Sequence, residues 1–426
     1  MSVSNIIMYM LPIIVTPILT RLYTPEAFGE WGIFSSFIVM ATMVLFLGFE
    51  NILIQAPEEQ LSDAVTLCAI VSLTVITFFA LIFGLGIAWG VDFFMGFPAC
   101  SLLFIYFGCY AIYTICYNLC NRNQLYYTLA ISNVVLGGSQ AVFRILLALI
   151  CLQSINGLIL GTTMAEGLTA LFLLGTLLKT TFPVPVSHIQ FSHLQKLVLQ
   201  YRNFPLYDAP SSLLSFAAFN LPVIILSLYF DKAAIGCFSI VLQLLLLPMS
   251  LVGSAIGKVY YQRISVQGQP SHYLCDTTHE ALRILCVISV LPLLFIACGG
   301  DKLIVLFLGS QWQSAGYVAL CLALWSFPTI LTQPLLPMFR VLNKQRTMLF
   351  YDTLYFLLGI GSIILLCYQT HNLYLILLTY AVVCFFVKIA LFFKLLNLCQ
   401  LHISRYFIYI PLWIISITIL TLRLVL

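Results

Sequence analysis

Apolar residues occur in long, almost uninterrupted runs that are separated by short polar stretches. Thirteen runs can be distinguished, at about residues 3–20, 31–53, 64–90, 99–120, 126–151, 157–178, 206–229, 236–257, 281–299, 315–339, 348–368, 373–396 and 406–424. A helix that crosses the hydrocarbon core of a bilayer needs about 20 predominantly apolar residues. The pattern therefore predicts an all-α, polytopic membrane protein. Because the last run contains Pro411 and Arg423, we expect either twelve or thirteen transmembrane helices.

The composition excludes several other classes of protein. Of the 426 residues, 62% are apolar and 8% are charged, whereas about a quarter of the residues of an average soluble domain are charged. A soluble enzyme, a disordered protein and a secreted disulfide scaffold are thereby excluded. The strands of an outer-membrane barrel alternate apolar and polar residues, which these runs do not. The net charge of +4 is small and scattered, so nucleic acid is not an expected partner.

The cysteines and the first apolar run each have an ordinary explanation. Fourteen cysteines are spread singly along the apolar runs, and the close pair Cys116 and Cys120 has no His or further Cys beside it. Zinc sites need clustered ligands, so we expect small apolar side chains and no metal. The first run lacks a preceding basic segment and a cleavage site, so we expect a span and not a signal peptide.

The basic residues predict the orientation in the membrane. With the N-terminus in the cytoplasm, the inner loops and helix ends hold twelve Lys and Arg residues and the outer side holds four. The inner set is Arg122, Lys179, Lys196, Arg202, Lys258, Arg263, Arg283, Arg340, Lys344, Arg346, Lys394 and Arg405, and the outer set is Arg21, Lys232, Lys302 and Arg423. Because cytoplasmic loops carry the excess of Lys and Arg, we predict a cytoplasmic N-terminus.

The longest inner connection divides the chain into two halves. Residues 179–205 begin with Lys179 and then place Phe191, Leu194, Leu197, Val198 and Tyr201 on one helical face, which is typical of an interfacial amphipathic helix. The expected organisation is a six-helix bundle at 1–178, a cytoplasmic linker at 179–205, and a bundle of six to seven helices at 206–426.

The two halves resemble each other at the start of each bundle. Residues 24–29 (TPEAFG) lead into the second run, and residues 231–236 (DKAAIG), 207 positions later, lead into the eighth. In each copy a polar residue, Thr24 or Asp231, can cap the helix that follows, and Pro25 suits the first helical position. Six spans per repeat preserve topology, so we expect two parallel-repeat bundles around a central cavity, as in alternating-access transporters.

Several motifs, in order, resemble one family. Residues 17–29 (PILTRLYTPEAFG) resemble the first-loop signature P-L-L-T-R-x-x-S-P-E-x-F/Y-G of the Wzx-type polysaccharide flippases of the MOP superfamily. Further segments resemble that family at 48–54 with 57–59, 157–161, 204–205, 221–222, 247–257, 308–316 and 342–346. The resemblance as a whole covers residues 12 to about 370.

The resemblance implies a function, a location and partners. Such proteins move an undecaprenyl-pyrophosphate-linked oligosaccharide between the leaflets of the bacterial inner membrane for O-antigen or other surface polysaccharide synthesis. They break no covalent bond, so the resemblance implies a transporter and not an enzyme, without a cofactor and with proton or sodium coupling left open. Implied partners are the lipid-linked oligosaccharide, membrane lipids, and a polysaccharide polymerase with its chain-length proteins. Twelve spans with both ends in the cytoplasm are usual in this family.

Two other functions remain open on the residues. A multidrug or cation antiporter of the same superfamily would need more acidic residues in the membrane core. A polysaccharide polymerase or a lipid-dependent glycosyltransferase generally has a large polar outer loop, whereas every outer loop predicted here is shorter than about 16 residues.

Arg144 and Lys388 are the basic residues that fall within apolar runs, and Glu166 is the acid predicted deepest in the membrane. Arg144 lies about 10 Å below the outer boundary of the fifth run, where an arginine should face the bundle interior. It could bind the pyrophosphate or the sugar, form a structural pair, or reach the interface. Glu166 lies about nine residues into the sixth run, at similar depth. It could pair with Arg144, the arrangement we favour, or bind and release a coupling ion.

The remaining candidates lie near the ends of runs. Asp208, Glu50 and Asp352 could be coupling acids, although a helix cap suits Asp208 and a solvated boundary position suits the other two. Arg21, Lys232, Lys258 and Arg340 end helices, where they could contact the substrate or anchor the helix at the interface.

Overall fold

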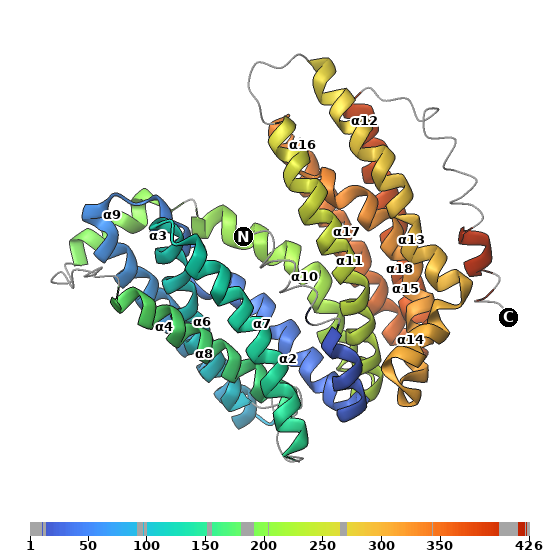
Figure 1. Ribbon diagram of the computed structural model, residues 1–426, viewed down its shortest axis with the longest axis horizontal. Helices are drawn as coiled ribbons and strands as arrows, with labels where there is room; N and C mark the ends of the chain where they lie inside the picture. The colour runs from blue at the N-terminus through green and yellow to red at the C-terminus, as the bar shows by residue number, and fades with distance from the viewer. Residues whose placement is uncertain are drawn as a thin grey trace. The chain divides into compact units, whose positions relative to one another are not determined.

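The computed structural model describes residues 11, 14–91, 97, 100–150, 156–179, 191–202, 204–264, 271–342, 344–399, 416–421 and 423. All the regular elements formed by these residues are helical, with no strand among them. The chain forms two compact units, Met1–Ile224 and Ile225–Leu426, which the blue-to-green and green-to-red ribbons of Figure 1 trace in turn. The expected all-helical membrane fold is confirmed.

Unit 1 contains the helices of the first half of the chain. They are α2 (Pro25–Leu45), α3 (Ile52–Gln55), α4 (Leu61–Ala88), α6 (Cys100–Arg122), α7 (Tyr126–Leu149), α8 (Gly157–Lys179), α9 (Phe191–Gln200) and most of α10 (Ala209–Leu226). The start of α2 follows the sequence prediction. The Thr24 Oγ1 atom accepts a hydrogen bond from the Ala27 N–H at 3.4 Å, and Pro25 occupies the first turn, where its missing N–H leaves no partner unsatisfied.

A short irregular segment joins α2 to α4 and is held by α6 and α9. The Arg122 guanidinium, at the end of α6, donates to the carbonyl oxygens of Leu53 at 3.2 Å and Ala56 at 2.6 Å. Leu194 and Leu197 of α9 are buried against this segment and α4. The predicted amphipathic helix is therefore present, and unit 1 covers part of its apolar face.

Unit 2 contains the remaining helices. They are α11 (Lys232–Ile264), α12 (Ser271–Ile288), α13 (Val290–Phe295), α14 (Asp301–Leu308), α15 (Gln313–Thr332), α16 (Pro337–Val341), α17 (Gln345–Gln369) and α18 (Leu373–Leu398). With 33 residues, α11 is about 50 Å long and exceeds the hydrocarbon thickness of about 30 Å. Its last turns contact α12 through an Arg263–Glu280 ion pair at 3.2 Å and a Tyr260–Thr278 hydrogen bond at 2.9 Å.

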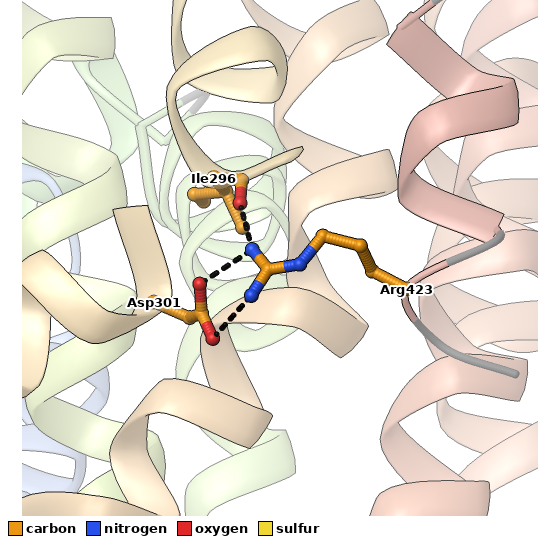
Figure 2. A network of polar contacts seen from close by, with 3 residues as sticks. All are labelled: Ile296, Asp301 and Arg423. Atoms are coloured by element: carbon orange, nitrogen blue, oxygen red, sulfur yellow. Dashed lines mark hydrogen bonds and ion pairs between the residues drawn. The ribbon is translucent and has the colours of Figure 1, made fainter. Parts of the chain in front are cut away.

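The helix that precedes α15 is broken between α13 and α14. A π-helical turn at Ile296–Gly300 contains Gly299 with a φ of 112°, a left-handed conformation that glycine adopts without a steric penalty. Figure 2 shows Arg423 bonded to both sides of this break. Its guanidinium donates to the Ile296 carbonyl at 3.0 Å and binds both Asp301 carboxylate oxygens, at 2.6 and 3.0 Å.

Within the described ranges, nine helices are long and apolar enough to cross a membrane. Of two shorter apolar helices, Phe216–Leu226 lies within the seventh predicted run and Lys232–Leu246 overlaps the eighth. The first run is helical over residues 14–20, and its residues 3–10 lie outside the described residues. The thirteenth run is helical at 416–421 and 423, and the rest of it also lies outside them.

Candidate functional site

Arg144 lies where α7 packs closely against Gly161 of α8. The ideal Cβ position of Gly161 on α8 is only 2.9 Å from the Arg144 Cγ atom and 3.0 Å from its backbone nitrogen. Because no larger residue would fit there, Gly161 allows the two helices to approach. The Arg144 Nη2 atom then donates to the Thr162 Oγ1 atom at 2.8 Å, and the Thr162 hydroxyl donates to the Leu158 carbonyl at 2.6 Å.

The beginning of α2 and the loop before it complete the surroundings of Arg144. The Arg144 Cζ atom lies 5.0 Å from the centroid of the Trp31 ring, a cation–π contact. The Tyr23 hydroxyl donates to the Arg144 carbonyl oxygen at 2.7 Å. Burial raises the pKa of Tyr23 to about 12 despite the opposing effect of the Arg144 charge, so the hydroxyl stays protonated and remains a donor. We call Tyr23, Trp31, Arg144 and Thr162 the arginine cluster.

The arginine cluster contains no acidic residue. No carboxylate among the described residues lies within ion-pair distance of Arg144. Its Nε atom and the Trp31 Nε1 atom are both buried without a hydrogen-bond partner in the described part of the chain. A cation held in this way in a membrane helix is energetically unfavourable, by a few kcal/mol or more. The cluster is therefore an electropositive site with no carboxylate and with two unpaired donors.

The predicted pair between Arg144 and Glu166 is not formed. Arg144 is opposite Gly161 and Thr162, and Glu166 lies four residues beyond Thr162, about 6 Å further along α8. Glu166 is 3% exposed and interacts electrostatically with the phenol groups of Tyr106 and Tyr113 on α6. The prediction failed because equal depth in adjacent helices does not specify the direction in which each side chain points.

Glu166 faces a row of tyrosines along α6. The ring centroids of Tyr106 and Tyr110 lie 6.1 Å apart, those of Tyr110 and Tyr113 6.3 Å, and those of Tyr113 and Tyr117 5.6 Å. No Lys, Arg or His within the described ranges forms an ion pair with Glu166. Glu166 is thus a buried acid among neutral polar rings. Binding of a proton or another small cation to its carboxylate would remove the negative charge from this environment.

The other predicted residues do not join the arginine cluster. Glu50 is half-buried in the turn Phe49–Asn51 and interacts electrostatically with Cys68, and Asp352 is half-buried in α17. Arg21 and Lys232 are exposed. The backbone places Asp208 at the end of the π-helical turn before α10, Lys258 in α11 and Arg340 in α16, and their side chains lie outside the described structure.

Sequence reasoning missed a second buried cation, in unit 2. Lys388 of α18 is 5% exposed, and its Nζ atom lies 4.6 Å from the centroid of the Tyr355 ring of α17. The Tyr355 hydroxyl accepts a hydrogen bond from the Trp325 Nε1 atom at 2.8 Å, and Asp352 interacts electrostatically with Lys388. A lysine in the middle of the run 373–396 was the available signal. Trp31 had no such signal, since only the packing of α2 brings it to Arg144.

The cysteines act as packing residues in the described part of the chain. All thirteen that the structure describes lie outside any disulfide, and most are buried. No group of three or more His, Cys, Asp or Glu residues that could hold a metal ion occurs among the described residues.

Comparison with known proteins gives one family match. A family model described as "Polysaccharide biosynthesis protein" matches residues 18–316, which is more than half of the chain. Comparison of the sequence with curated proteins gives no match.

Solved structures share the fold at low sequence identity. A lipid II flippase MurJ in an inward closed conformation has a TM-score of 0.75 at 11% identity, covering 99% of this chain and 91% of its own. An inward-facing multidrug resistance MATE family transporter of the MOP superfamily has a TM-score of 0.69 at 14% identity, covering 92% and 94%. A MATE structure in the straight conformation has a TM-score of 0.56 at 14% identity, covering 93% of each chain.

Proposed function

The chain belongs to the family of polysaccharide biosynthesis proteins, and from this premise we propose that it is a flippase for lipid-linked oligosaccharides. The expected substrate is an undecaprenyl-pyrophosphate-linked repeat unit of O-antigen or another surface polysaccharide, moved across the bacterial inner membrane by alternating access. The MOP-type helical fold, shared with a lipid II flippase, supports this proposal. Translocation forms and breaks no covalent bond, so the proposed function requires no catalytic residue.

One observation carries the proposal: the arginine cluster, in which the Arg144 Nε and Trp31 Nε1 atoms are buried, has donors but no acid. A diphosphate bears several negative charges and many acceptor oxygens, and guanidinium groups bind phosphates through paired hydrogen bonds. Bound at Arg144, the diphosphate would neutralise the cation, and the cation would lower the energetic cost of bringing the diphosphate into the membrane. The two charges would each compensate the other.

We further propose Glu166 as the residue that couples translocation to an ion gradient. A carboxylate buried among tyrosines, without an ion-pair partner in the described structure, is unfavourable when ionised. Binding of a proton or a sodium ion would remove that cost, and release would restore it. A cycle of binding and release could therefore bias the conformations of the protein.

The proposal is tested by substitutions at Arg144. We expect Arg144→Ala to reduce export of the surface polysaccharide at least tenfold, because it removes the charge, and Arg144→Lys to retain part of the export. Arg346→Ala, an exposed arginine at the start of α17, is the matched control and should export normally. Membrane levels are measured by immunoblot for each variant.

Two outcomes would contradict the proposed site or the proposed function. Normal export by Arg144→Ala at a normal membrane level would remove Arg144 from the substrate path. Drug resistance on overproduction, without any effect of deletion on the surface polysaccharide, would favour an antiporter. The fold shared with a multidrug transporter is the reason to include that measurement.

A further inference from the structure

Trp31 contributes a second hydrogen-bond donor beside Arg144. Its ring lies under the guanidinium, with 5.0 Å between the Arg144 Cζ atom and the ring centroid. A cation–π contact uses only the face of the ring. The Nε1–H group at the edge of the ring takes no part in this contact, and it is buried without a hydrogen-bond partner among the described residues.

An indole N–H group in this position needs an explanation. Buried Trp side chains usually pair this group, as the buried Trp325 does with the Tyr355 hydroxyl at 2.8 Å. An unpaired polar group in a membrane helix costs more than one that can reach water. Trp31 is therefore positioned at an energetic penalty that a different aromatic residue would avoid, since Phe would offer the same kind of ring face without the donor.

The neighbouring Arg144 guanidinium also has a donor without a hydrogen-bond partner. The Arg144 Nε atom is also buried and unpaired in the described structure, while Nη2 is already used by Thr162. The 5.0 Å between the Arg144 Cζ atom and the Trp31 ring centroid puts these two unpaired donors on side chains that are in contact with each other. A diphosphate offers acceptor oxygens on two linked phosphorus atoms, so it can accept from both donors at once.

We propose that the Trp31 Nε1–H group and the Arg144 guanidinium together bind the diphosphate of the lipid-linked substrate. This inference rests on the proposed function and adds a specificity residue to the same site. Trp31 would favour a ligand with several adjacent acceptors over a lipid that presents a single phosphate.

The test uses the full-length protein in nanodiscs and equilibrium binding of undecaprenyl diphosphate, with undecaprenyl monophosphate as the comparison. Trp31→Phe keeps an aromatic face beneath Arg144 and removes only the donor. We expect it to weaken diphosphate binding about threefold to tenfold, the effect of one hydrogen bond, and to weaken monophosphate binding less. The control Trp89→Phe, at a residue that is 79% exposed, should leave both affinities unchanged.

A second measurement does not depend on the variant folding normally. In wild-type protein labelled with ¹⁵N at tryptophan, addition of undecaprenyl diphosphate should move the Trp31 indole proton resonance downfield, as expected for a newly formed hydrogen bond. Wild-type affinity in Trp31→Phe, or an unmoved Trp31 resonance at saturating diphosphate, overturns the inference.

The outcomes separate this inference from the proposed function. If Arg144→Ala abolishes diphosphate binding and Trp31→Phe does not change it, Arg144 alone binds the ligand and only the role of Trp31 fails. If Arg144→Ala binds and flips the lipid like the wild type, the proposed site itself fails.

Discussion

At the scale of single residues, two glycines determine how the arginine cluster is assembled. The ideal Cβ position of Gly157 lies in contact with the Tyr23 hydroxyl oxygen, and that of Gly161 lies 2.9 Å from the Arg144 Cγ atom. A side chain at Gly157 would displace the Tyr23 hydroxyl, and one at Gly161 would meet the Arg144 backbone and push α8 away from α7. The Arg144–Thr162 hydrogen bond and the Tyr23 contact thus depend on two glycines, which have no functional group in their side chains.

Glu166 gives a prediction at this scale. Because Glu166 forms no ion pair with Arg144, Glu166→Gln leaves no newly unpaired arginine. We expect a normal membrane level of the variant and a change of at most about 1 kcal/mol in the free energy of unfolding. Transport by this variant should stall or lose its dependence on the proton gradient, since Gln mimics the protonated acid. Flipping assays in proteoliposomes with and without an imposed gradient measure this.

The control for Glu166 is Glu58→Gln, because Glu58 is exposed and lies outside the tyrosine row. It should behave as the wild type with and without a gradient. If Glu166→Gln instead lowers the protein level and a second Arg144→Gln change restores it, the pair forms in another conformation of the protein. Normal, gradient-dependent transport would remove Glu166 from coupling.

At the scale of secondary-structure elements, Arg423 holds the break between α13 and α14. It bonds to Ile296, within the π-helical turn, and to Asp301, the first residue of α14 (Figure 2). Both charged side chains are mostly shielded from solvent, with 25% and 13% of their surfaces exposed. One guanidinium therefore joins the two helical segments on either side of the turn at Gly299.

This contact predicts a measurable contribution to stability. Arg423→Gln and Asp301→Asn should each lower the free energy of unfolding by about 1–3 kcal/mol, because each leaves a partly buried charge without its partner. The double variant should be less destabilised than the sum of the two single ones. Thermal unfolding in nanodiscs provides the comparison, and strict additivity would show that the pair contributes nothing.

At the scale of the whole molecule, the basic residues predict the orientation in the membrane. With twelve Lys and Arg residues on one side and four on the other, we expect the N-terminus and the connection 179–205 in the cytoplasm. Alkaline phosphatase fused after residue 190 should be inactive, and green fluorescent protein fused there should be fluorescent. The opposite pattern would reverse the predicted orientation of every helix.

The class of protein, the apolar helical runs and the cap of α2 could be predicted from the amino-acid sequence alone. Spanning runs can be read directly because the hydrocarbon thickness sets a minimum length of apolar chain, which is a local property. The Thr24–Pro25 start of α2 was also predictable, because a helix cap involves residues three positions apart. The family match agrees with the motifs of the sequence. Each motif is a continuous stretch of residues, so it can be recognised without the tertiary structure.

Only the tertiary structure decided the partners of the buried charges. Position within a run gives the depth of a residue, but not the direction of its side chain or the identity of the adjacent helix. Depth suggested that Arg144 pairs with Glu166, whereas the close approach at Gly161 directs Arg144 to Thr162 and Trp31. The contact of Lys388 with Tyr355 was missed for the same reason. At Arg144 the partners are set by Gly161, which allows α7 and α8 to approach, and such an approach is a property of a pair of helices and not of either sequence alone.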